Sequence, residues 1–178
     1  MRRWCDWTDN EADQTRYARR SAEAFINKER SRFFVRGEIS GNFAVHFFAQ
    51  NKGLSPARVT YGFVGCEIFS GDEKFKEVPD YTGGDPEWVF SRNEWILPDQ
   101  EGRIGNYDAG FISEVENPEL FAWMMGREHK VWFYGVVRYS DSVSQRGHEV
   151  RFCYETLIRD DGSLVLFKSG SEAYRREK

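Results

Sequence analysis

The sequence of 178 residues lacks any long hydrophobic run. No apolar stretch approaches the roughly 18 residues that a membrane-spanning helix needs, so the sequence predicts no such helix. The first residues, MRRWCDWTDNEADQ, begin with two arginines but contain no apolar core, and we do not expect them to act as a secretory signal. Cysteine is also scarce, because Cys5, Cys66 and Cys153 are odd in number and have no metal-type spacing. We therefore predict a reducing, cytoplasmic setting with neither a disulfide framework nor a metal site.

Catalytic and cofactor motifs are missing as well. The chain has no Walker A loop, dinucleotide fingerprint, nucleophile elbow or His-Glu-x-x-His motif, so no cofactor and no reaction class are indicated. The formal net charge of −4 argues against a domain-wide basic footprint for nucleic acid. What these exclusions leave is a globular protein, since 40% of the residues are hydrophobic and 30% are charged. The length suits one domain with a full-sized core.

Aromatic residues are abundant, and they favour strands. They make up 16% of the chain, and flat side chains fit pleated surfaces. Strand-like runs recur at hairpin spacing, separated by turn signals such as the segment NKGLSP at residues 51–56. The sequence therefore predicts an all-β protein, an antiparallel immunoglobulin-like β-sandwich of about seven to nine strands. The expected strands are 33–40, 42–51, 57–69, 87–97, 111–112, 131–139, 148–157 and 164–168, with a loop at 98–108 and a frayed polar tail.

A basic amphipathic helix is predicted at the N-terminus, within residues 1–31. Residues 10–31 contain neither Gly nor Pro, and apolar residues recur on one face of the helix. From Arg16 to Arg36 there are seven Lys or Arg residues against two Glu. The commoner interpretation is a solvated helix face, and the other is a stripe that binds a protein partner, an anionic lipid surface or a second copy of the chain. The candidate binding residues are Arg16, Arg19, Arg20, Phe25 and Arg30.

The best polar cluster is predicted at the turn of a hairpin formed by residues 131–157. Asp141 and His148 lie at the two ends of this turn, and Glu149 follows. We predict that Asp141 accepts backbone hydrogen bonds and that His148 donates to Asp141, which makes both residues structural. The alternative is a metal site or a base–orienter pair, which the sequence favours less because no third ligand has the usual spacing.

The first strand of this hairpin, residues 131–139, carries aromatic side chains on both of its faces. We therefore predict a central strand that is covered on both sides. The second cover would be the N-terminal helix or a short helix over residues 118–125. That short helix has an Asn117 cap, a proline at its first position and Gly126 after its end.

Four segments together resemble a known family. They are ERSRFFVRGEI, QNKGLSPARV, WILPDQEG and, above all, VWFYGVVRYSDSVSQRGHEVRFCYET. They are similar to a family of uncharacterised bacterial proteins that have a short N-terminal segment, one membrane anchor, a basic Ala-rich helix and an immunoglobulin-like β-sandwich. The resemblance covers roughly residues 20–160. Two departures stand out: residues 1–13 are polar where the family has its anchor, and the segment VSQRG at 143–147 replaces the family's Phe-Gly.

The resemblance implies the fold and a position near a membrane, but no reaction. The expected organisation is the helix at 1–31, the β-sandwich at 32–170 and the tail at 171–178. Our leading hypothesis is a non-enzymatic interaction or sensing module, cytoplasmic or peripheral at the inner membrane of a bacterium. One alternative is a small-ligand receptor, for instance for a nucleotide, with a deep pocket lined by Arg and Trp or Tyr. The other is a hydrolase that uses His148 with Asp141 or Glu149.

Overall fold

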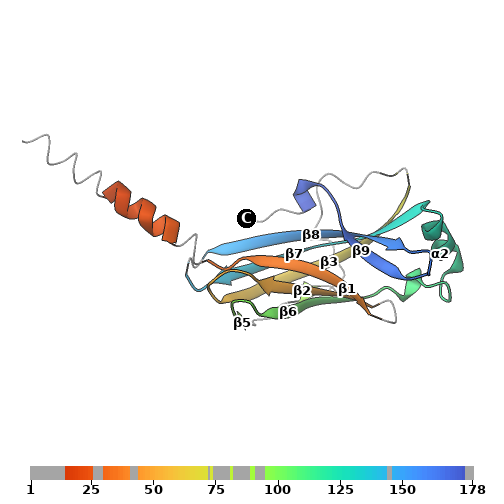
Figure 1. The fold of residues 1–178 in the computed structure, drawn as a ribbon, viewed down its shortest axis with the longest axis horizontal. Coiled ribbons are helices and arrows are strands. Elements are labelled where there is room, and N and C mark those ends of the chain that lie inside the picture. The colour runs from red at the N-terminus through yellow and green to blue at the C-terminus, as the bar shows by residue number, and fades with distance from the viewer. Residues whose placement is uncertain are drawn as a thin grey trace, which may run out of the picture.

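The computed structural model describes residues 15–25, 30–40, 44–71, 73, 81, 89–90, 95–143 and 146–174. This part of the chain is all-β and antiparallel, which confirms the predicted fold class at that level. The smaller sheet has the strand order β1-β2-β6, and the larger, curled sheet has the order β4-β3-β7-β8-β9, with β5 also pairing with β3 (Figure 1). The strands are β1 (Phe33–Ser40), β2 (Ala44–Asn51), β3 (Ala57–Ser70), β4 (Val89–Phe90), β5 (Trp95–Ile96), β6 (Glu101–Asp108), β7 (His129–Asp141), β8 (Gly147–Ile158) and β9 (Leu164–Lys168).

The two sheets, which we call the β body, face each other across one hydrophobic core. Phe47 of β2 is fully buried, and its ring centre lies 5.1 Å from that of Phe152 in β8 and 6.0 Å from that of Phe133 in β7. Successive side chains of a strand point to opposite faces, so alternate residues of β2 enter this core. Burying each such aromatic side chain contributes about 1.5–3 kcal/mol, which is what holds the sheets together.

The larger sheet is buried on its outer face as well. A second cluster lies there and consists of Phe63, Tyr81, Tyr134, Val136 and Cys153. Strand β7 is thus covered on both sides, as its two-sided aromatic pattern predicts. The predicted source of this cover was wrong, because Tyr81 and Ala173 supply contacts on this face. Helix α2 (Pro118–Met125) instead packs Leu120 and Met124 into the core between the sheets.

Two predicted elements differ from the structure, and a third is described only in part. Within the strand expected at 87–97, β4 and β5 each pair with β3, and residues 87–88 and 91–94 fall outside the described residues. The loop expected at 98–108 contains β6, whose only fully buried side chain is Ile104, so the strand lacks the apolar repeat that would reveal it. The strand expected at 111–112 is a turn of 3₁₀ helix, because backbone hydrogen bonds join Ile112 to Ala109 and Ser113 to Gly110.

The two helices form where the sequence predicts them. Oδ1 of Asn117 accepts a hydrogen bond from the amide of Leu120 at 3.1 Å, and α2 ends before Gly126. The N-terminal helix occupies residues 15–25, all of them exposed, and it lies beyond the two sheets (Figure 1). Residues 10–14 and 26–29 of the predicted helix fall outside the described residues, and residues 30–31, which the prediction included, are described and are not helical. In the part of the chain that the structure describes, no helix is long and apolar enough to cross a membrane.

Candidate interaction surface at the helix end

The β body has two ends that differ in chemistry. At one end, which we call the helix end, residues 30–32, 51–58, 95–100 and 141–143 meet beside the N-terminal helix (Figure 1). Helix α2 marks the opposite end, which we call the α2 end (Figure 1). The helix end contains Arg30, one of the predicted binding residues, and the N-terminal helix carries the others.

A buried asparagine joins the segments of the helix end. Asn51 closes strand β2 and has no exposed surface. Its Oδ1 accepts hydrogen bonds from the amides of Arg32 (3.3 Å) and Gly53 (3.0 Å), and its Nδ2 donates to the carbonyls of Ser55 (2.8 Å) and Ile96 (3.1 Å). A buried amide that uses both its donors and its acceptor in this way fixes the turns around it. The sequence marks this position only as part of a turn.

Gly53 makes room for residues 30–32, which follow the N-terminal helix in the sequence, to pack against this turn. A Cβ atom at position 53 would lie 2.2 Å from the carbonyl oxygen of Arg30, so only glycine fits. The amide of Lys52 also donates to the carbonyl of Arg32 at 2.7 Å. Residues 30–32 are therefore held against the β body.

Four large apolar side chains are exposed at the helix end, and we call them the tip face. They are Leu54 (57% exposed), Trp95 (53%), Leu97 (45%) and Val143 (37%). Hydrogen bonds place their turns together, because Ser142 donates to the carbonyl of Pro56 at 3.2 Å and Asp99 donates to that of Asn51 at 2.8 Å. Strand β5 brings Trp95 opposite Arg58 of β3.

The charges around the tip face are mainly basic. Arg32, Lys52 and Arg146 are exposed, and Arg30 and Arg58 are partly exposed. Among the described acidic residues at or next to this end, Asp99 lies 3.7 Å from Nζ of Lys52, Glu101 pairs with Arg36, and Asp141 is buried. In a chain of net charge −4, the residues that the structure describes at this end thus carry a local excess of positive charge.

The α2 end carries the opposite charge. It exposes apolar side chains too, among them Val115, Trp123 and Met125. The carboxylates beside them are exposed and outnumber the two exposed arginines of this end, Arg127 and Arg159. These acidic residues are Glu114, Glu116, Glu119, Glu128, Asp160 and Asp161.

The predicted binding residues divide into two sets in the structure. Arg16, Arg19, Arg20 and Phe25 belong to the N-terminal helix, where all four are exposed, and Nε of Arg19 lies 3.0 Å from Glu23. Arg30 lies next to the turn that contains Gly53. The tip face was missed, because its residues come from three segments far apart in the sequence and no pattern in these segments indicates that they meet.

Asp141 and His148 meet at the mouth of the β7–β8 hairpin. Nε2 of His148 lies 2.8 Å from Oδ2 of Asp141, whose other oxygen accepts a hydrogen bond from the amide of Val143 at 2.9 Å. The imidazole also stacks on Tyr139, with ring centres 5.2 Å apart. The geometry is compatible with the structural role predicted for this pair.

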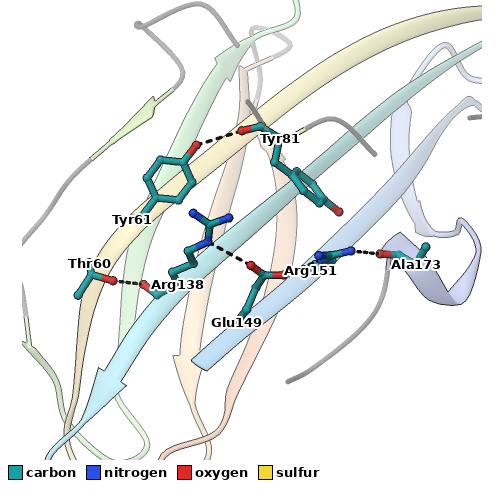
Figure 2. Close-up of polar contacts among 7 residues, drawn as sticks. All are labelled: Thr60, Tyr61, Tyr81, Arg138, Glu149, Arg151 and Ala173. Atoms are coloured by element: carbon teal, nitrogen blue, oxygen red, sulfur yellow. Dashed lines mark hydrogen bonds and ion pairs between the residues drawn. The ribbon is translucent and has the colours of Figure 1, made fainter. Parts of the chain in front are cut away.

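Glu149 points to the other face of the sheet and belongs to a different cluster (Figure 2). Its carboxylate accepts hydrogen bonds from Nε of Arg151 (2.7 Å) and Nε of Arg138 (3.1 Å). Burial raises the pKa of Glu149, but the hydrogen bonds from the two arginines outweigh burial and hold this pKa below its ordinary value. Glu149 is therefore an ionised ion-pair partner and not a proton acceptor poised near neutral pH.

The same cluster anchors two tyrosines and the C-terminal segment (Figure 2). The guanidinium of Arg138 lies 5.0 Å from the ring centre of Tyr61, and that of Arg151 lies 5.1 Å from the ring centre of Tyr81. Arg151 also donates to the carbonyl of Ala173, which belongs to a helical turn at Glu172–Tyr174. The tail that we expected to be frayed is thus ordered at least as far as residue 174.

Two further features bear on ligand chemistry. A groove of about 450 Å³ opens at the α2 end, but no Trp or Tyr lines it. It thus differs from the pocket expected of a nucleotide receptor. Its lining residues are Met124, Arg127, Leu157, Ile158, Arg159, Asp160, Asp161, Val165 and Phe167. Among the residues with described positions, no group of three His, Cys, Asp or Glu side chains could hold a metal ion.

The cysteines of the described residues are free thiols, Cys66 and Cys153. Burial raises the pKa of the Cys66 thiol to about 12, although a hydrogen bond with Tyr107 acts in the opposite direction. A thiol with such a pKa stays protonated at neutral pH and is a poor nucleophile.

Comparisons with known proteins add little to these observations. No protein-family model and no curated protein matches the chain. Among solved structures, a protein from Archaeoglobus fulgidus is similar at 7% sequence identity, with a TM-score of 0.31, over 80% of this chain and 99% of that one. A likeness at this level carries no argument about function.

Proposed function

We propose that this protein is a non-enzymatic interaction module that binds an anionic membrane surface through its helix end, at the cytoplasmic face of a bacterial membrane. An immunoglobulin-like arrangement of the β body is part of the same proposal. The observation that carries it is the segregation of charge, in which an acidic chain presents an exposed basic helix and basic turns at one end and carboxylates at the other.

The magnitudes favour weak, salt-sensitive binding. Each Lys or Arg close to an anionic leaflet contributes on the order of 1 kcal/mol. Arg16, Arg19 and Arg20 of the helix, with Arg32 and Lys52 of the body, therefore supply a few kcal/mol. The carboxylates of the α2 end oppose this less than the net charge suggests, because they lie at the far end of the body and the Debye length in physiological salt is about 8 Å.

Flotation with lipid vesicles tests this proposal. We expect the protein to float with vesicles of phosphatidylcholine and phosphatidylglycerol, to float less with phosphatidylcholine alone, and to be released by about 0.5 M salt. The triple variant R16E/R19E/R20E should lose this binding. The variant R127E/R159E/K168E makes the same charge change at exposed basic residues outside the helix end and should bind like the wild type. Equal recovery with neutral and anionic vesicles would refute the proposal.

The two alternative functions receive less support from the geometry. The hydrolase hypothesis needs His148 beside a carboxylate at an open site, and Asp141 is buried while Glu149 lies on the opposite face of the strand. The receptor hypothesis retains one supporting observation, the groove at the α2 end with Arg127 and Arg159 on its rim. Neither the surroundings of His148 nor the groove at the α2 end gathers as many exposed basic side chains as the helix end and its helix do.

A further inference from the structure

We infer that the tip face inserts into the lipid–water interface, so that the β body stands end-on at the membrane with α2 pointing away from it. This inference rests on the proposed function and adds the orientation and the residues that enter the bilayer. The basic helix alone would tether the body in any orientation. Insertion of Leu54, Trp95, Leu97 and Val143 would hold it in one.

The tip face is built as a fixed surface. Its turns are joined by Asn51 and by the hydrogen bonds of Ser142 and Asp99, so little conformational freedom is lost when it binds. The N-terminal helix starts from the same end, because Arg30 lies against Gly53. A helix bound to the membrane therefore brings the tip face towards the same surface.

The chemistry of the tip face suits the interfacial layer of a bilayer. Leu54, Leu97 and Val143 are exposed apolar groups outside the strands, and Arg32, Lys52 and Arg146 are exposed in the segments that meet at the same end. Trp95 has an apolar ring with one polar N–H, the kind of side chain that is enriched at membrane–water interfaces. Apolar tips can enter the acyl boundary while the cations remain with the anionic headgroups.

Charge selects between the two apolar ends of the molecule. Trp123 at the α2 end is 43% exposed, close to the 53% of Trp95. It lies among exposed carboxylates that an anionic leaflet repels, including Glu119 and Glu128. The same charges also favour lipid over a second copy of the chain as the occupant of the tip face, since two basic helix ends repel each other.

Quenching of tryptophan fluorescence by brominated lipids tests the inference on the full chain. The difference between the spectra of the wild type and W95F isolates the emission of Trp95, and the difference from W123F isolates that of Trp123. With anionic vesicles that carry bromine on the acyl chains near the headgroup, we expect quenching of the Trp95 signal and no quenching of the Trp123 signal. Quenching of both signals, or of neither in protein that floats with the vesicles, overturns the inference.

A pair of uncharged variants provides a second measurement. L54S/L97S should weaken partitioning into anionic vesicles by about tenfold, because two leucines no longer leave water. V115S/M125S removes two exposed apolar side chains at the α2 end and should leave partitioning unchanged. Thermal unfolding of both variants checks that they are folded.

The outcomes separate the inference from the proposal on which it rests. If wild type and L54S/L97S bind vesicles equally well and Trp95 is not quenched, the helix alone tethers the protein, so the inference fails and the proposed function stands. If the wild type does not bind anionic vesicles, the proposed function fails first. If L54S/L97S changes the sedimentation of lipid-free protein, a second copy covers the tip face, which also overturns the inference.

Discussion

The helix end and the α2 end both expose large apolar side chains, but the charges around those side chains are opposite. Trp95 lies opposite Arg58 at an end that also exposes Arg32 and Lys52, whereas Trp123 lies next to Glu119 and Glu128. An exposed apolar side chain alone is common and does not define a binding surface. In this molecule the surrounding charge decides which of the two ends suits an anionic membrane.

The two ends also differ in how they are built. The α2 end depends on local devices, such as the Asn117 cap three residues before the amide that it serves. The helix end depends on long-range contacts, in which Asn51 reaches Arg32 and Ile96. Loss of one residue should therefore disturb several turns at the helix end but only one at the α2 end. Matched substitutions at the two ends test this difference.

Asn51→Ala should have the largest effect. The substitution leaves the amides of Arg32 and Gly53 and the carbonyls of Ser55 and Ile96 without this partner, and each loss costs about 1–3 kcal/mol where water cannot enter. We expect a loss of roughly 3–5 kcal/mol in the free energy of unfolding. Asn117→Ala, the matched change at the α2 end, removes a helix cap and should cost about 1 kcal/mol. Urea unfolding monitored by circular dichroism compares the two, and equal losses would contradict the difference in construction.

Gly53→Ala should come next. The new methyl group would lie 2.2 Å from the carbonyl oxygen of Arg30, so the backbone of residues 30–32 has to move. We expect a cost of about 2–3 kcal/mol, the size typical of overpacking. Gly126→Ala at the α2 end meets its nearest atom at 3.4 Å and has a φ of −70°, so it should change stability by about 0.5 kcal/mol or less. A Gly53→Ala protein that melts like the wild type would show that the contact with residues 30–32 does not form in solution.

The sequence predicts the strands of the core far better than it predicts either end. Residues 33–40, 57–69 and 131–139 carry alternating or aromatic patterns that fix strands by local geometry. Strand β6 was missed because its single buried residue, Ile104, is flanked by Gly and polar residues that favour turns.

The tip face could not be predicted from the sequence at all. Leu54, Trp95 and Val143 are separated by about 40 residues or more along the chain, and only the pairing of β3 with β5 and β7 brings them to one end. The burial of a polar residue such as Asn51 could not be predicted either, because it depends on contacts between these distant segments. The basic helix, by contrast, is a local feature of the sequence. Its arginines could therefore be predicted as candidate binding residues from the sequence alone.

His148→Ala should have a moderate effect. It removes the contact with buried Asp141 and the stacking on Tyr139, and we expect a loss of about 1–2 kcal/mol with no effect on vesicle binding. His129→Ala at the α2 end removes a ring stacked at 4.8 Å on the exposed Trp123 and should cost about 0.5 kcal/mol. Differential scanning calorimetry measures both. Unchanged melting of His148→Ala together with a lost metal- or ligand-binding activity would instead revive the enzyme hypothesis.

The smallest effect concerns acid stability, and it compares a paired carboxylate with an exposed one. Burial opposes ionisation of Glu149, but hydrogen bonds from Arg151 and Arg138 lower its pKa in the folded protein. A carboxyl whose pKa is lowered by folding stabilises the protein above its unfolded pKa, near 4.3, and loses this contribution as the pH falls through the folded value. Glu149→Gln should therefore cost about 1 kcal/mol at pH 7 and flatten the loss of stability below about pH 4.5.

The control is Asp161 at the α2 end, whose pKa is also lowered, mainly by its hydrogen bonds with Ser163. Because Asp161 is fully exposed, Asp161→Asn should leave the pH profile as it is in the wild type. Urea midpoints measured from pH 7 to pH 3 give the three profiles, and a wild-type slope in Glu149→Gln would mean that the two arginines do not hold this carboxylate in solution.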